Sequence, residues 1–465
     1  MKTVRMRKLA GLMAVACLLA GLDGRAGMGA ADPLQKINYV IVIYQENHSF
    51  DNYFGNFPGA DGIANAGVAA TQVDKQGRPY VSLPKPLANP KEERRAPDPR
   101  FPADLPNRPF LFNKFVPPSE QTANQIHAFY RNQYQINGGK MDKFVAWTDA
   151  GGTVMGYWDL AELPLYKLAQ EYTLADRFFQ AAFGGSLLNH QWLICACTPM
   201  FPNAPKDMLS IPFPDNPDHL QDIVVTPDGY VVNHTGSHPA YSVNSPRPAN
   251  AKPDHLVPNQ TAPTIGDRLI AAGVSWAWYA GGWKDALAGR PPERFQFHHQ
   301  PFAYFANYAD GTARKAQHLK DEAEFFAALQ NGTLPSVSFV KPIGLDNEHP
   351  LYTTVLRGQE HVANLVRAVQ ASRYWNEVVI VITYDDNGGY WDHVPPPVID
   401  RWGPGPRVPA VIVSPWAKRG YIDHTTYDTT SILKFIETRW NLAPLGTRDA
   451  AANNLTNAFN VPAAR

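Results

Sequence analysis

The sequence predicts an α/β protein in which one mostly parallel sheet is covered by helices on both faces. Short runs of apolar, β-branched residues, such as 40–44 and 378–384, have the composition of strands that are buried on both faces. Segments with helical periodicity separate these runs along the chain, and this alternation is typical of a parallel sheet with crossover helices. No linker divides the chain, so we expect one large domain.

The first 31 residues are predicted to be a secretory signal peptide and not part of the fold. Basic residues within 2–8 precede the apolar stretch 9–22, and small residues suitable for cleavage follow at 29–31. The apolar stretch is short for a membrane span, and no later segment has 18 uncharged apolar residues. We therefore expect a periplasmic or secreted protein that has no transmembrane segment after signal cleavage.

Residues 32–465 are expected to form a single α/β domain with loop insertions near 60–118 and 199–263, which are rich in Pro and Asn. Apolar runs predict strands at 40–44, 173–179, 274–279, 337–340, 378–384 and 408–413. Periodicity and capping residues predict helices at 120–133, 157–172, 187–197, 264–272, 319–329, 358–371 and 429–440.

Charge and cysteine content narrow the class of protein further. The chain has 42 basic and 42 acidic residues, which is unlike the basic surface of a nucleic-acid binder, so we expect no nucleic-acid partner. Cys195 and Cys197 are the cysteines that remain after cleavage. Residues two apart on a helix do not face each other, so we expect two buried thiols and no disulfide.

Polar residues follow two of the predicted strands at the point where each strand ends. Glu46 and Asn47 follow the strand 40–44, and Asp385 and Asp386 follow the strand 378–384. The carboxyl ends of parallel strands meet at one edge of a sheet, where ligands bind. Three carboxylates that meet there repel one another and favour a cation. Oxygen ligands suit Mg, Ca or Mn, and a nearby histidine would also admit Zn or Fe.

Ser186 is predicted at the N-cap of the helix 187–197, directly after Gly184 and Gly185. The N–H groups at a helix N-terminus and the helix dipole favour anions, phosphate above all. A nearby metal ion can activate a serine hydroxyl as a nucleophile. An ordinary helix cap is the competing interpretation of this serine.

Several histidines lie close to these segments in the predicted fold. A histidine can donate to phosphoryl oxygens or protonate a leaving group, although a single histidine is more often a structural residue. The candidates are His127, His298, His299, His349 and His393. Taken with three carboxylates and a serine at a helix N-terminus, this set favours metal-assisted phosphoryl transfer.

Seven stretches of the chain resemble the bacterial phosphoesterase family of acid phosphatases and haemolytic and non-haemolytic phospholipases C. They are IVIYQENHSFDNYFG, HAFYRNQYQINGGKMDKFV, GGSLLNHQW, FHHQPFAYF, NEHP, TYDDNGGYWDHV and TTYDTTSILKFIE, and they occur in the family's order. The resemblance implies a three-layer α/β/α sandwich, similar to that of the alkaline phosphatase superfamily. It also implies one divalent metal ion, for which Ca, Mg, Mn, Zn and Fe all remain open.

The same resemblance implies a role for each matching residue. Glu46, Asn47, Asp385 and Asp386 would be metal ligands. Ser186 would be the nucleophile that forms a phosphoseryl intermediate, and it would also contact the metal. The phosphate pocket would be lined by His127, His298, His299 and His349, and one of the last three would act as the acid for the leaving group.

A serine in the context GGSLLNH resembles the acid phosphatases, whereas the related phospholipases place threonine there. The expected function is therefore a secreted, metal-dependent acid phosphatase that acts on phosphate monoesters. A phospholipase C that cleaves phosphatidylcholine-type diesters is the alternative, and an inactive phosphate-ester binding protein is a further one. A sulfatase-like hydrolase is disfavoured because residues 186–190 lack the Pro and Arg of that motif. The expected partner is a phosphate ester, with phospholipid as the alternative, and the oligomeric state stays open.

Overall fold

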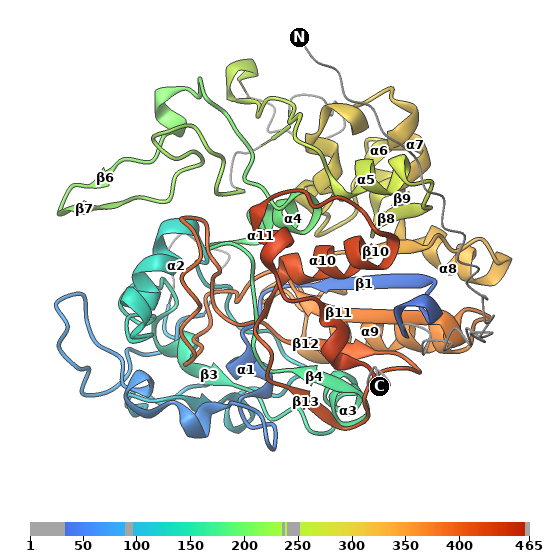
Figure 1. The fold of residues 1–465 in the computed structure, drawn as a ribbon. Coiled ribbons are helices and arrows are strands. Elements are labelled where there is room, and N and C mark those ends of the chain that lie inside the picture. The colour runs from blue at the N-terminus through green and yellow to red at the C-terminus, as the bar shows by residue number, and fades with distance from the viewer. Residues whose placement is uncertain (1–32, 89–95, 235–237, 240–251, 461–465) are drawn as a thin grey trace, which may run out of the picture. The chain divides into compact units, whose positions relative to one another are not determined.

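An eight-stranded sheet lies at the centre of the structure (Figure 1). Its strand order is β13-β4-β12-β11-β1-β10-β8-β9, and β12 is the strand that runs antiparallel to its two neighbours. The mostly parallel α/β sheet predicted from the sequence is therefore confirmed. The strands are β1 (Tyr39–Gln45), β4 (Thr173–Ala175), β8 (Trp276–Ala280), β9 (Leu319–Asp321), β10 (Val337–Lys341), β11 (Val378–Tyr384), β12 (Ala410–Val413) and β13 (Tyr421–Asp423).

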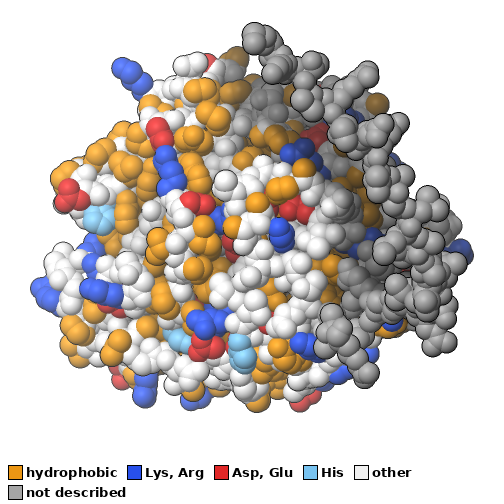
Figure 2. Space-filling view, in the orientation of Figure 1, with side chains coloured by type: hydrophobic (Ala, Val, Ile, Leu, Met, Phe, Trp, Pro, Cys, Tyr) orange, Lys and Arg blue, Asp and Glu red, His pale blue; other side chains and the backbone are white. Residues whose placement is uncertain are grey.

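The computed structural model describes residues 33–88, 96–234, 238–239 and 252–460, and the predicted signal peptide lies outside these ranges. Residues 32–461 group together as one compact unit. Among the described helices, none is both long enough and apolar enough to cross a membrane. On the face seen in Figure 2, acidic and basic side chains of the described residues are interspersed and not gathered in one patch.

The helices form two groups, in which α4 packs against α10 and α3 packs against α9. In Figure 1, α4 and α10 lie on one side of the blue strand β1, and α9 and α3 lie on the other side of it. The helices are α1 (Phe50–Phe54), α2 (Phe129–Ile136), α3 (Pro164–Glu171), α4 (Ser186–Cys195), α5 (Ile265–Ala271), α6 (Trp283–Leu287), α7 (Ala313–His318), α8 (Glu322–Asn331), α9 (Val355–Gln370), α10 (Thr429–Trp440) and α11 (Thr447–Ala451).

The two predicted insertions lie outside the main sheet. The described part of 60–118 forms short turns and the strand β2 (Phe110–Leu111), which pairs with β3 (Gly156–Tyr157). The described part of 199–263 contributes the hairpin of β6 (Pro212–Phe213) and β7 (Asn216–Leu220). The remaining short strands, β5 (Phe178–Phe179) and β14 (Tyr427–Asp428), pair with each other.

Strands β1 and β11 are the core of the sheet. Their residues 40–44 and 378–384 are almost completely buried, as continuous apolar runs predict for strands covered on both faces. The two strands pair in parallel from Tyr39 beside Val378 to Gln45 beside Tyr384. Because the two strands pair residue for residue and end side by side, the residues that follow them begin at the same level of the sheet.

The predicted helix 120–133 is wrong over its first part, because α2 begins at Phe129 and His127 lies in an irregular segment. Side chains from distant segments accept the backbone N–H groups here. Asp149 Oδ1 accepts from Ile126 N (2.9 Å), and Asp222 Oδ1 accepts from Tyr130 N (2.7 Å). The bond to Ile126 competes with helix formation before α2, whereas the bond to Tyr130 satisfies an N–H group in the first turn of α2. Neither long-range bond has a signature in the local sequence.

The expectation that Cys195 and Cys197 are separate thiols is also wrong. Helix α4 ends at Cys195 because Ala196 adopts a left-handed conformation, with φ of 47°. The chain then turns back, and the two cysteines form a disulfide with their Cα atoms 5.1 Å apart. The geometry of a continuous helix therefore did not apply to this pair.

A buried cluster of charges ties α1 to the loop after β11. Arg407 is fully buried, and it donates from Nε to Asp392 (2.8 Å) and from Nη2 to Asp51 (3.0 Å). Its Nη1 donates to the backbone carbonyls of Asp61 and Asp176. His393, one of the candidate histidines, belongs to this cluster because its Nδ1 lies 2.6 Å from Asp51.

We predict that Arg407→Met destabilises the protein strongly, because it leaves the buried carboxylates of Asp51 and Asp392 without their cation. Removal of one partner of a buried ion pair costs about 3–5 kcal/mol. Chemical denaturation should show a loss of this size in the free energy of unfolding. As the control, Arg419→Met removes an exposed ion pair with Glu171 and should cost about 0–1 kcal/mol. Equal stability of the two variants would contradict a structural role for the cluster.

Candidate active site

The polar residues that follow β1 and β11 come together at the carboxyl edge of the sheet. The backbone N–H of Asn47 donates to Asp385 Oδ1 (3.2 Å), and the backbone N–H of Asp385 donates to Gln45 O (3.0 Å). Glu46, Asn47, Asp385 and Asp386 are fully buried. The structure therefore brings together the four residues that the sequence predicts as metal ligands.

A tight backbone crossing holds this arrangement in place. Asn47 adopts a left-handed conformation with φ of 67°, which asparagine tolerates better than most residues. Gly388 passes directly over Asn47, and a Cβ atom at Gly388 would lie 2.3 Å from Asn47 O. Glycine at this position thus allows the loop after β11 to approach the end of β1.

Ser186 lies at the same edge, at the start of α4. It is the first helical residue, and Gly185 occupies the N-cap position predicted for Ser186, so the prediction is wrong by one residue. The Ser186 side chain makes no capping bond; its Oγ lies 3.2 Å from Glu46 Oε2 and 3.3 Å from Asp386 Oδ2. The ordinary helix cap is therefore excluded, and the hydroxyl faces the carboxylates.

The buried carboxyl groups differ in their charge. Burial would raise the pKa of Glu46, but His299 and Lys341 lower it well below its ordinary value. Burial, and then the charge of Glu46, raise the pKa of Asp385 to about 8. Burial and the charge of Asp385 raise the pKa of Asp386 well above its ordinary value. Burial, together with the repulsion between these groups, thus keeps protons on Asp385 and Asp386 near neutral pH.

The donor atoms at this edge fit a divalent metal ion. Among the described residues, the buried atoms Asn47 Oδ1 and Asp385 Oδ2 have no hydrogen-bond partner. A buried acceptor without a partner is costly, and a cation bound between these oxygens would remove that cost. The cation would also relieve the repulsion between the carboxylates.

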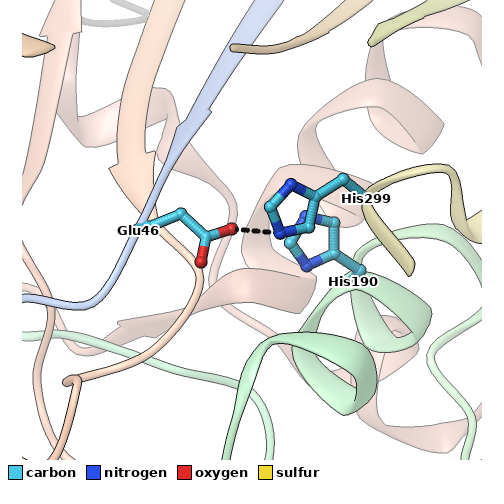
Figure 3. A group of neighbouring side chains, drawn as sticks. All are labelled: Glu46, His190 and His299. Carbon is cyan, nitrogen blue, oxygen red and sulfur yellow. Dashed lines mark ion pairs between the residues drawn. The ribbon is translucent and has the colours of Figure 1, made fainter. Parts of the chain in front are cut away.

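Histidines border the carboxylate cluster on one side. Nε2 of His299 lies 2.8 Å from Glu46 Oε1, and the ring of His190 stacks on His299 with 5.2 Å between centroids. Figure 3 shows both rings facing the Glu46 carboxylate. The ring of His298 lies 4.6 Å from that of His299, measured between centroids.

Of the other predicted histidines, His127 lies beside Asn47 and His349 lies near His127. Nε2 of His127 is 3.2 Å from Asn47 Nδ2, and the ring of His349 lies 6.2 Å from that of His127. Burial lowers the pKa of His127 and lowers that of His349 to about 3, so both rings are neutral at pH 7. Each ring donates from Nδ1 to a backbone carbonyl, that of Gln125 or Pro350, which leaves Nε2 as an acceptor.

Two residues of the cluster were not predicted from the sequence. Lys341 is buried at the end of β10 and forms an ion pair with Glu46 Oε1. A lysine that closes an apolar strand is the signal that could have identified it. His190 lies four residues after Ser186 on α4, so the helical repeat places both on one face. Glu46, His190 and His299 could together hold a metal ion through one oxygen and two nitrogens.

The group of Asp51, Asp392 and His393 also has the residue types of a metal site. Here the guanidinium of Arg407 already binds both carboxylates, so the group is an ion-pair cluster of the fold. His393 is therefore the one candidate histidine that the structure places apart from the carboxylate cluster.

Known proteins resemble the chain over most of its length. It is 26% identical to a non-hemolytic phospholipase C of Burkholderia pseudomallei over 92% of this chain and 59% of the relative. It is 25% identical to phospholipase C A of Mycobacterium tuberculosis over 92% of this chain and 78% of the relative. The chain thus spans less than two thirds of the Burkholderia protein.

Among solved structures, a protein of the alkaline phosphatase superfamily from Vibrio parahaemolyticus resembles the chain with a TM-score of 0.35 and 12% identity. The likeness covers 65% of this chain and 66% of the other. A family model described as "Phosphoesterase family" matches residues 37–443. This match includes both strands that carry the carboxylates, the helix that carries Ser186 and the bordering histidines. The chain belongs to the phosphoesterase family.

Proposed function

We propose that the protein is a metal-dependent acid phosphatase that hydrolyses phosphate monoesters through a phosphoserine at Ser186. Its family makes it a hydrolase of phosphoric ester bonds. The assignment of Ser186 as the nucleophile rests on one observation, the position of its hydroxyl group. It lies at the N-terminus of α4, within hydrogen-bond distance of Glu46 and Asp386, and it caps nothing. A hydroxyl so placed is available to attack a phosphoryl group bound at the helix N-terminus.

The protein's own residues supply most of what this reaction needs. Backbone N–H groups of the first turn of α4 would donate to a phosphoryl group bound there, and they would need no reorganisation to do so. A divalent metal held by Glu46, Asn47, Asp385 and Asp386 would supply positive charge that stabilises the deprotonated serine. The bordering histidines are neutral in the absence of substrate, and a phosphate dianion beside them would favour their protonated, donating forms.

A phospholipase C is the second candidate, and a specific observation favours it. Relatives named as phospholipases C match 92% of this chain, including the segments that carry the site. We rank the monoesterase first because Ser186 stands in the context that resembles acid phosphatases. The inactive binding protein is the weakest candidate, since the proposed nucleophile and all the proposed ligands are present.

We also propose that the protein is exported. A basic segment, an apolar stretch and small residues at 29–31 have the order of a signal peptide. Cleavage after this point would leave residues 32–465 as one α/β domain.

We predict that Ser186→Ala lowers the turnover of phosphate monoesters by about a thousandfold or more, because it removes the proposed nucleophile. Turnover should be measured with an aryl phosphate and with phosphatidylcholine, so that one panel also separates the two candidate activities. Ser275→Ala is the matched control and should retain activity, because this exposed residue directly precedes β8 at the opposite end of the sheet. Normal turnover by Ser186→Ala on both substrates would remove the serine from the mechanism.

We predict that the metal-free protein binds a divalent cation more tightly at pH 8 than at pH 6. The metal-free carboxyls of Asp385 and Asp386 have raised pKa values, so the cation must displace protons, and this cost falls as the pH rises. Calorimetry at both pH values measures the affinity and the protons released. Asp386→Asn should weaken binding while the exposed control Asp285→Asn does not. An affinity that is independent of pH and of Asp386 would argue against this ligand set.

A further inference from the structure

A cavity of about 440 Å³ lies beside the candidate active site. It is lined by residues 124–128, by Asp149 and by the segments 222–224 and 233–234. Binding cavities for small molecules have volumes of about 300–1,000 Å³, so this one can hold a small alcohol. Its lining comes largely from the irregular segment before α2 and from the insertion after α4.

The cavity shares two histidines with the site. His127 lines it, and Nε2 of the same ring lies 3.2 Å from Asn47 Nδ2. His234 also lines it, and its ring lies 5.0 Å from that of His298, measured between centroids. A phosphate ester bound among the carboxylates and histidines would therefore have its organic part next to this cavity.

The charged residues in the described lining of the cavity are acidic. Asp149 and Asp222 line the cavity, and none of the described lining residues is lysine or arginine. The side chain of Asp222 is 5% exposed, and its Oδ2 has no hydrogen-bond partner among the described residues. Arg131 Nε lies 3.6 Å away from this oxygen, too far for a good hydrogen bond. Arg131 therefore forms an ion pair with Asp222, but Asp222 Oδ2 remains a buried acceptor without a hydrogen bond among the described residues.

Burial raises the pKa of Asp222 to about 6, in spite of the charge of Arg131 and of hydrogen bonds from Tyr130 N, Arg131 N and the Asn233 side chain. The carboxyl group is therefore ionised at pH 7, but at a cost that a cationic ligand would remove. Asn124 Oδ1 is a second buried acceptor without a partner in the described structure, and it lies in the same lining.

The lining also indicates which kind of cation fits. Quaternary ammonium groups have no N–H to donate and are recognised by the faces of aromatic rings. The described lining contains no Phe, Tyr or Trp, but it offers carboxylate and amide oxygens. These oxygens suit a primary ammonium group, which donates three hydrogen bonds.

We propose that this cavity binds the amino-alcohol part of the phosphate ester and selects a primary ammonium group through Asp222. The inference rests on the proposed function, because the phosphate itself is taken to bind at Ser186. The shared chemistry is a phosphoethanolamine group, which occurs both as a free monoester and as a lipid headgroup.

The test compares three esters of similar size: phosphoethanolamine, 2-hydroxyethyl phosphate and phosphocholine. For the wild-type protein, kcat/KM should be about tenfold or more higher for phosphoethanolamine than for either of the others. Asp222→Asn should lower kcat/KM for phosphoethanolamine by about tenfold to a hundredfold, and leave 2-hydroxyethyl phosphate within about threefold. Asp218→Asn, an exposed change on β7, is the matched control.

A second arm uses vesicles of phosphatidylethanolamine in phosphatidylcholine, with released diacylglycerol as the readout. Dependence on Asp222 in either arm supports the cavity and identifies the source of the ammonium group. If Asp222→Asn fails to fold, Asn124→Ala, which removes the second unpartnered acceptor of the described lining, takes its place. Equal kcat/KM for all three esters, or a preference for phosphocholine, would overturn the proposal.

The experiments distinguish an error in the proposed ammonium site from an error in the proposed function. Hydrolysis of an aryl phosphate without any selectivity for the ammonium ester overturns the cavity alone. If no ester is hydrolysed, calorimetry with phosphoethanolamine still decides: binding that Asp222→Asn weakens supports the cavity, and binding that is absent or unchanged refutes it.

Discussion

The mutual repulsion of three buried carboxyl groups, those of Glu46, Asp385 and Asp386, is the constraint on which the site depends. Strands β1 and β11 pair residue for residue, which brings the three carboxyl groups to one level of the sheet. Burial removes the water that would screen their charges. Lys341 compensates for the charge of Glu46, but protons remain on the two aspartates. Such an arrangement is stable with a cation, and Ser186 lies where that cation would act on its hydroxyl.

The fold supports this constraint with a second cluster of charges. Arg407 joins Asp51 of α1 to Asp392, in the loop that begins with Asp385 and Asp386. Close approach of Gly388 to Asn47 fixes the other part of that loop. The backbone crossing and the buried ion pairs thus hold the loop that carries Asp385 and Asp386 against the end of β1.

The central part of the fold could be predicted from the sequence because it follows local rules. The bounds of β11 and α10 agree with their apolar pattern and capping residues, and the site edge follows from the ends of β1 and β11. Contacts between segments that are distant in the sequence could not be predicted, because local patterns do not encode them. Asp149 accepts the N–H of Ile126 before α2, and a left-handed Ala196 brings Cys195 to Cys197. Lys341 reaches Glu46 from the neighbouring strand β10.

The most direct test of the account is a rapid acid quench during turnover of an ester labelled in its phosphoryl group, followed by peptide mapping. A serine nucleophile must carry the phosphoryl group between two steps, so the label should appear transiently on the peptide that contains Ser186. Label should accumulate within the first turnover and disappear as substrate is exhausted. Turnover at the normal rate with no label on Ser186 would contradict the account, and would indicate direct attack of water on the ester.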